Sequence, residues 1–295
     1  MNDSVIMVSD LIKRYGSVLA LDGFGLEVGP GEVHGFLGPN GAGKTTMIRI
    51  LLGLLRADSG SVSVFGLDPW TDATPVHARL AYVPGDVTLW PSLTGGEVID
   101  LIARLNGRQP ARLQELLERF ELDPTKKCRT YSKGNRQKVA LVAAFAAEAE
   151  LLIFDEPTSG LDPLMEQVFG DELEAARQRG ATVLLSSHIL SEAERLCDRL
   201  SIIRAGRLVA SAPLEQLRGA RHSFVTAQLD RPPRLESITG LVDVELDGGN
   251  LRCRVEPAAL DDLLRALANA GVRGVTITPP TLEEVFLSHY QTAPR

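Results

Sequence analysis

Residues Gly38 to Thr46 read Gly-Pro-Asn-Gly-Ala-Gly-Lys-Thr-Thr and match the pattern G-x-x-x-x-G-K-[ST] at every fixed position. The apolar run Val33 to Leu37 before them predicts a buried strand, and Met47 to Leu52 starts an apolar helix after them. A glycine-rich loop between strand and helix lets backbone N–H groups converge on phosphate oxygens, and the helix N-terminus favours the same anion. The flanking elements favour a phosphate-binding loop over the alternative, an ordinary glycine-rich turn.

The lysine and the hydroxyl residue that end this loop have separate tasks. Lys44 is expected to reach the β- and γ-phosphates of a nucleoside triphosphate, and Thr45 to offer its hydroxyl to Mg²⁺. The predicted nucleotide-binding residues of the loop are Gly38, Pro39, Asn40, Gly41, Ala42, Gly43, Lys44, Thr45 and Thr46.

An acidic pair follows the short apolar run Leu151 to Phe154, which predicts a buried parallel strand. Such a strand delivers Asp155 and Glu156 to the carboxyl edge of the sheet, where the phosphate-binding loop also lies. Asp155 is then the natural partner of Mg²⁺, and Glu156 is positioned to act as a general base on water. The alternative is a carboxylate pair that only caps the next helix.

A histidine, His188, follows the predicted strand Thr182 to Ser186. A lone histidine is more often structural than catalytic. This one is expected at the same sheet edge as Glu156, where its imidazole could donate to a γ-phosphate.

Composition limits the other function classes. The chain has 295 residues, 44% of them hydrophobic, which allows one large domain and a smaller one. A net charge of -7 argues against a nucleic-acid surface. Three scattered cysteines, Cys128, Cys197 and Cys253, suit reduced thiols in a cytosolic compartment. The longest apolar runs are about half the length that spans a bilayer, so the chain is not expected to cross a membrane.

The rest of the chain predicts three further regions. Residues 5 to 36 read as strands of an antiparallel flank, with turns at Tyr15-Gly16 and Asp22-Gly23. Tyr15 either stacks on adenine or covers a core edge. A helical insertion spans about residues 86–148, with a capping box at Thr94 to Glu97, a helix beginning at Pro110 and a helix over Val139 to Ala149.

The third region, residues 219–295, predicts a small α+β domain. It has four predicted strands and a helix at about Ala258 to Ala270, and the turn Asp247 to Asn250 makes the middle strands a hairpin. It carries no acid/base pair or glycine cradle, which favours a packing or dimerisation role.

The order of these motifs, over about residues 5 to 218, resembles the order found in ABC-type ATPases. The likeness implies an α/β P-loop NTPase with an antiparallel β flank and helical insertion over residues 1–218, followed by the small C-terminal domain. It also implies ATP and Mg²⁺ as cofactors, with Tyr15 stacking on adenine. Glu156, His188 and Lys44 would be catalytic, with Thr45 and Asp155 as the metal residues. Asp162 would belong to the loop that couples two subunits.

Two stretches depart from the family pattern. The signature turn reads Tyr131-Ser132-Lys133-Gly134-Asn135 in place of Leu-Ser-Gly-Gly-Gln, so Ser132 and Gly134, the pair expected to contact phosphate in the opposing subunit, are retained. Where the family has a glutamine, this chain has Gly85 and Asp86. Asp86 is therefore a candidate for a water-mediated metal contact, and the alternative is a link through backbone.

These departures and the ending Pro280 to Leu287 resemble the branch of drug and antibiotic exporters that includes daunorubicin- and tetronasin-type resistance ATPases. That likeness implies a multispanning membrane permease on a separate chain and a second ATPase subunit, expected to be a second copy of this chain. It places the protein at the cytoplasmic face of the cell membrane, peripheral through its permease. The rival readings are a soluble ABC ATPase not linked to transport, a phosphotransferase and a non-enzymatic regulatory module.

Overall fold

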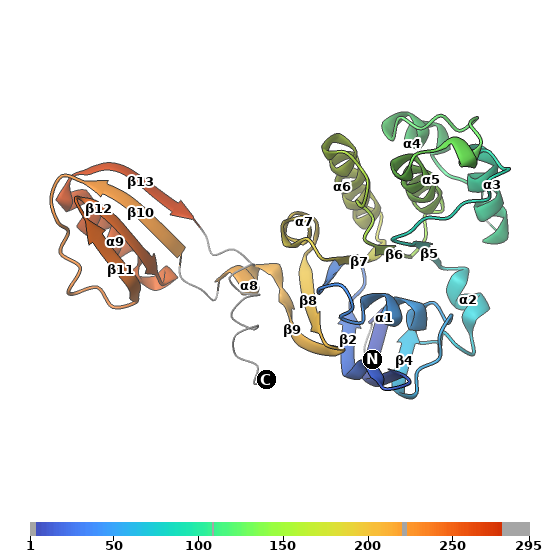
Figure 1. Cartoon of the computed structure of the whole chain (residues 1–295), viewed down its shortest axis with the longest axis horizontal. Helices are drawn as coiled ribbons and strands as arrows, with labels where there is room; N and C mark the ends of the chain where they lie inside the picture. The colour runs from blue at the N-terminus through green and yellow to red at the C-terminus, as the bar shows by residue number, and fades with distance from the viewer. Residues whose placement is uncertain (1–3, 108, 220–222, 279–295) are drawn as a thin grey trace. The chain divides into compact units, whose positions relative to one another are not determined.

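The computed structural model describes residues 4–107, 109–219 and 223–278 (Figure 1). The chain divides into two compact units, Met1–Ala212 and Pro213–Arg295. The sequence placed the division after residue 218, whereas the structure groups α8, Leu214–Gly219, with the second unit. The ending Pro280 to Leu287 lies outside the described residues.

A six-stranded sheet forms the centre of the first unit, in the order β5-β6-β7-β3-β8-β9. The pairs β5–β6, β6–β7, β7–β3 and β3–β8 are parallel, as the apolar runs predicted. Parallel pairing brings the ends of β3, β6 and β7 to one edge. The strands are β3 (Val33–Leu37), β5 (Leu80–Val83), β6 (Leu151–Asp155), β7 (Thr182–Ser187), β8 (Arg199–Arg204) and β9 (Arg207–Pro213).

The predicted antiparallel flank is a three-stranded sheet in the order β2-β1-β4. Its strands are β1 (Ile6–Tyr15), β2 (Val18–Val28) and β4 (Ser59–Val64). The turn predicted at Asp22-Gly23 is wrong, because β2 continues through it. Gly23 has a φ of +60° next to a register shift opposite β1, so this glycine accommodates a bulge within the strand.

Helix α1 (Lys44–Leu51) contacts β2, β4 and β6, and its buried apolar residues belong to a core that joins both sheets. The remaining helices of this unit are α2 (Ala73–His77), α3 (Gly95–Leu105), α4 (Leu113–Arg119), the short 3-10 helix η1 (Cys128–Thr130), α5 (Lys133–Ala146), α6 (Pro163–Gln178) and α7 (Leu190–Leu196). Within the described ranges, no helix combines the length and the apolar character needed to cross a bilayer.

Helices α3, α4 and α5 form the helical insertion (Figure 1). The capping box at Thr94 and Glu97 is confirmed, since each side chain accepts from the other residue's backbone N–H. Two predicted helix starts are wrong. Helix α4 begins after Pro110, at Leu113, and α5 begins at Lys133 because Ser132 caps it, well before the apolar run at Val139.

The second unit packs α9 (Leu260–Ala270) against a four-stranded antiparallel sheet in the order β11-β12-β10-β13. Buried apolar side chains of β10, β12 and α9 form its own core. The predicted hairpin between β11 and β12 is confirmed. After α8, the described elements of this unit are β10 (Ser223–Leu229), β11 (Leu241–Asp247), β12 (Asn250–Val255), the 3-10 helix η2 (Pro257–Ala259), α9 and β13 (Val272–Thr278).

Candidate active site

The phosphate-binding loop connects the fully buried strand β3 to α1. Gly43 has a φ of +114°, and a Cβ there would lie 2.6 Å from the carbonyl oxygen of Ala20. A Cβ on Gly38 would lie 2.5 Å from the carbonyl oxygen of Ile203. Both glycines are therefore required by close backbone approach, and Gly43 also by conformation.

Lys44, the first residue of α1, is 5% exposed. Its Nζ donates to the carbonyl oxygens of Gly38 at 2.5 Å and Pro39 at 3.3 Å, and lies 3.7 Å from Oε1 of Glu156. Burial lowers the pKa of the ammonium group, while the carboxylates of Glu156 and Asp155 act in the opposite direction. A cation is thus held between the loop and the end of β6.

Thr45 and Asp155 meet at the sheet edge, where the Thr45 hydroxyl donates to Oδ2 of Asp155 at 3.1 Å. Asp155 is buried, and its Oδ1 accepts a short hydrogen bond from the hydroxyl of Ser186. A hydroxyl and a carboxylate suit Mg²⁺, which takes one or two protein oxygens and completes its shell with phosphate and water. The donor set therefore fits this ion.

Glu156 has a φ of +51°, an uncommon conformation for a residue with a side chain. Its backbone N–H donates to the carbonyl oxygen of Ser186 at 3.1 Å. Its Oε1 lies 3.1 Å from Nδ1 of His188, which follows β7. The structure therefore brings Lys44, Asp155, Glu156 and His188 together at one edge, and strained backbone of this kind is concentrated at functional sites.

Gly85 follows β5 and lies against the same pair of acids. A Cβ on Gly85 would be 3.0 Å from the carbonyl oxygen of Asp155 and 3.7 Å from Cβ of Glu156. The side chain of Asp86 is exposed. The stretch that replaces the expected glutamine thus borders the site through the backbone of Gly85.

The signature turn lies at the N-terminus of α5. Ser132 is exposed and accepts the N–H of Asn135 at 3.2 Å, while a Cβ on Gly134 would lie 2.5 Å from the carbonyl oxygen of Gly160. Lys133 Nζ donates to the hydroxyl of Ser159 at 2.8 Å. The turn therefore packs on the Ser159-Gly160 turn of its own chain.

The two remaining predicted site residues, Asp162 and Tyr15, lie at the start of a helix and at the end of a strand. Asp162 caps α6 by accepting the N–H of Met165 at 3.0 Å. Tyr15 ends β1 and is 46% exposed, with Lys13 Nζ 5.7 Å from its ring centroid. A ring exposed to this extent is free to stack on a base.

Sequence reasoning missed two residues that form hydrogen bonds at the site, Ser186 and Gln137. Ser186 bonds to both Asp155 and Glu156, and buried Gln137 donates to the carbonyl oxygen of Pro157 at 2.9 Å. Burial and the charge of Asp155 raise the pKa of Tyr82 to about 12. The sequence did contain a signal for Ser186, because a hydroxyl residue near the carboxyl end of the apolar strand β7 is expected to lie at the edge of the sheet that holds the site.

These features define the class. A glycine-rich loop between β3 and α1, a buried lysine and a strand-end carboxylate pair make this unit a P-loop nucleoside triphosphatase.

Comparison with known proteins gives the family. The family model described as ABC transporter matches residues 21–159, and the model described as the C-terminal domain of ATP-binding protein DrrA1-3-like matches residues 215–290. The daunorubicin resistance ATP-binding protein DrrA3 of Streptomyces coeruleorubidus is 40% identical over 97% of this chain and 96% of its own length. The chain belongs to the family of ABC transporter ATP-binding proteins and is an ATP-hydrolysing nucleotide-binding subunit.

Solved structures agree with this fold. One described as an ATP binding subunit of an ABC transporter has a TM-score of 0.68 and 34% identity, covering 72% of this chain and 92% of its own. The dimeric structure of the bacterial ABC transporter cassette MJ0796 has a TM-score of 0.64 and 25% identity, covering 71% and 98%.

Proposed function

We propose that this chain binds MgATP at the sheet edge and uses its hydrolysis to drive export by a separate membrane permease. The observation that carries the proposal is the cluster that Lys44 and Thr45 at the start of α1 form with Asp155, Glu156 and His188 at the ends of β6 and β7. Backbone N–H groups of the phosphate-binding loop cradle the phosphates, and the exposed ring of Tyr15 stacks on adenine. Thr45 and Asp155 would hold Mg²⁺, which would offset phosphate charge, and Asp86 would contact the ion through water.

In the hydrolytic step, Glu156 accepts a proton from the attacking water. The water oxygen bonds to the γ-phosphorus as the bond to the departing ADP oxygen breaks, which leaves ADP and phosphate. His188 lies at the same edge, with its Nδ1 3.1 Å from Oε1 of Glu156, and donates a ring N–H to the γ-phosphate. Lys44 meets the negative charge that develops on the transferring group.

The second half of each site comes from a second copy of the chain. Ser132 and Gly134 complete the opposing subunit's site, and Asp162 couples the two subunits. Two observations support this: Ser132 is exposed, and the signature turn packs on Ser159-Gly160, with Lys133 bonded to Ser159. MJ0796, a cassette of similar fold, is described as dimeric.

Mixed dimers test this arrangement. One chain carries Lys44→Ala and the other Ser132→Arg, whose long cation blocks the approach of the turn to phosphate. With shared sites, both lesions fall in one site and the other still occludes ATP. If both changes lie on one chain paired with wild type, each site contains one lesion, so occlusion should be lost. Occlusion measured on purified, differently tagged dimers separates the cases, and the opposite ranking would refute shared sites.

The membrane partner is a multispanning permease on a separate chain, which places this protein at the cytoplasmic face of the cell membrane. Gly85, Asp86 and Trp90 are the proposed contact, and Trp90 is 50% exposed. Likeness to the daunorubicin resistance protein supports a drug or antibiotic as the cargo.

Coexpression with its permease should carry this chain into the membrane fraction, whereas the chain expressed alone should stay in the supernatant. Trp90→Ala should weaken binding to the permease by about thirtyfold or more and so deplete the membrane-bound fraction, since a buried aromatic anchor contributes about 2 kcal/mol or more to an interface. Trp70→Ala is the matched control, because Trp70 is similarly exposed. Membrane association that both variants retain, or crosslinks to the permease confined to residues 220–295, would refute this contact.

A further inference from the structure

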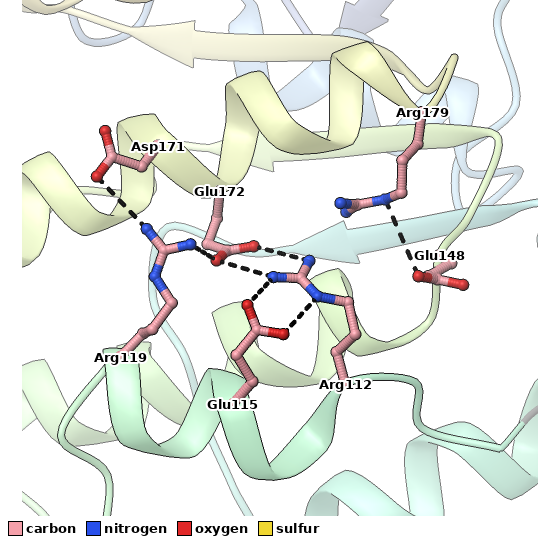
Figure 2. A network of polar contacts seen from close by, with 7 residues as sticks. All are labelled: Arg112, Glu115, Arg119, Glu148, Asp171, Glu172 and Arg179. Carbon is pink, nitrogen blue, oxygen red and sulfur yellow. Dashed lines mark hydrogen bonds and ion pairs between the residues drawn. The ribbon is translucent and has the colours of Figure 1, made fainter.

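Glu172 on α6 is fully buried, which is costly for a carboxylate unless charge and hydrogen bonds compensate. Two guanidinium groups do so. Arg112 donates to Glu172 through Nη1 at 3.2 Å and Nη2 at 3.3 Å, and Arg119 forms a short hydrogen bond with its Oε1. Figure 2 shows both arginines reaching from the insertion to this single carboxylate.

The two arginines hold α4 at both ends. Arg112 is the N-cap of α4 and Arg119 is its last residue. Outer carboxylates orient each guanidinium: Glu115 accepts from Arg112 at 2.9 and 2.5 Å, and Asp171 accepts from Arg119 at 3.4 Å (Figure 2). Both contacts to Glu172 thus fix the direction of α4 relative to α6 as well as its distance.

An aromatic cluster lies among the same elements. Phe145 of α5 lies 6.2 Å from Phe120 at the end of α4, 5.5 Å from Phe154 of β6 and 5.9 Å from Phe169 of α6, measured between ring centroids. Apolar packing already joins the insertion to the core. A buried ion pair adds little net stability over apolar packing, but it is directional and can select one orientation.

The helical insertion and α6, which these contacts join, each carry a residue of the proposed shared site. Ser132 is the N-cap of α5, and Asp162 is the N-cap of α6. We propose that Glu172 is a positioning residue that, through Arg112 and Arg119, orients the insertion so that Ser132 meets the nucleotide held by the opposing chain. The inference rests on the proposed shared site, and it assigns Glu172 no contact with ATP.

The experiment uses the full chain carrying Glu156→Gln, which retains ATP if Glu156 is the base. In this parent, Glu172→Gln keeps the side-chain shape and removes the charge. We expect the MgATP concentration at half-maximal dimerisation, measured by sedimentation, to rise at least about tenfold, since a misplacement of about 1 Å costs up to about a hundredfold. The affinity for ADP, which lacks the γ-phosphate that Ser132 is proposed to meet, should stay within about twofold of the parent's.

Glu118→Gln is the matched control, because it makes the same chemical change on the exposed face of α4, where Glu118 accepts a hydrogen bond from Gln114, and it should leave dimerisation unchanged. If Glu172→Gln unfolds, the triple change Arg112→Gln, Arg119→Gln and Glu172→Gln leaves no unpaired buried charge and repeats the test. Arg119→Lys keeps the charge without the planar fork and should give an intermediate effect.

The outcomes are separable. A parent that dimerises with ATP and a Glu172 variant that dimerises equally well would overturn the positioning role. A parallel fall in ADP affinity would also overturn it, because the change would then act on the whole domain. A parent that stays monomeric with ATP would overturn the shared site itself, and the inference with it.

Discussion

Glu156→Gln should lower ATP hydrolysis by about a hundred- to ten-thousandfold, the usual contribution of a positioned general base. Glutamine keeps the size of the side chain but cannot accept the proton of the attacking water at neutral pH. ATP binding should persist, since Lys44 and the phosphate-binding loop remain in place and Oε1 of Glu156 lies 3.7 Å from Nζ of Lys44. Binding without turnover should trap the closed dimer, which gel filtration with MgATP will show.

Glu150→Gln provides the control for this change. Glu150 precedes the same strand, β6, at its other end, where it pairs with Arg79 at 2.7 Å. It carries the same charge but lies away from the carboxyl edge, so its substitution should leave turnover near wild type. Normal turnover by Glu156→Gln, together with a monomer in the presence of ATP, would show that Glu156 is not the base.

Lys44→Ala should weaken ATP binding by about ten- to a hundredfold, because a lost charge-assisted contact is worth roughly 1.5 to 3 kcal/mol. Hydrolysis at saturating ATP should fall further, since Lys44 also meets charge that grows on the γ-phosphoryl group in the transition state. Calorimetric titration with ATP and single-turnover hydrolysis will measure the two effects separately.

Unfolding measurements distinguish a lost contact from a damaged fold. Lys44 is buried and its pKa is lowered by that burial, so removing the ammonium group relieves a desolvation cost. The unfolding temperature without nucleotide should therefore stay close to that of wild type, while the increase on adding ATP shrinks with the affinity. The exposed Lys126→Ala is the control. Wild-type turnover in Lys44→Ala would refute the assignment of the site.

Local patterns predicted the elements at the phosphate-binding edge. The apolar runs before Gly38, Asp155 and His188 are buried parallel strands, and parallel pairing alone brings their ends together. The same patterns gave wrong boundaries where a helix or strand extends through residues that are polar or typical of a turn. Helix α5 begins at Lys133 because a serine cap starts a helix whether or not its first turn is apolar, and β2 passes through Gly23 because a glycine bulge fits inside a paired strand.

By itself, the sequence determined the phosphate-binding loop, the acidic pair after β6 and the capping box, because each depends on residues a few positions apart whose geometry the backbone fixes. Only the tertiary structure decided which distant side chains support them. Ser186 reaches Asp155 across 31 positions and Arg112 reaches Glu172 across 60. Such partners are chosen by how strands and helices pack, and packing over long separations leaves no periodic signal in the chain.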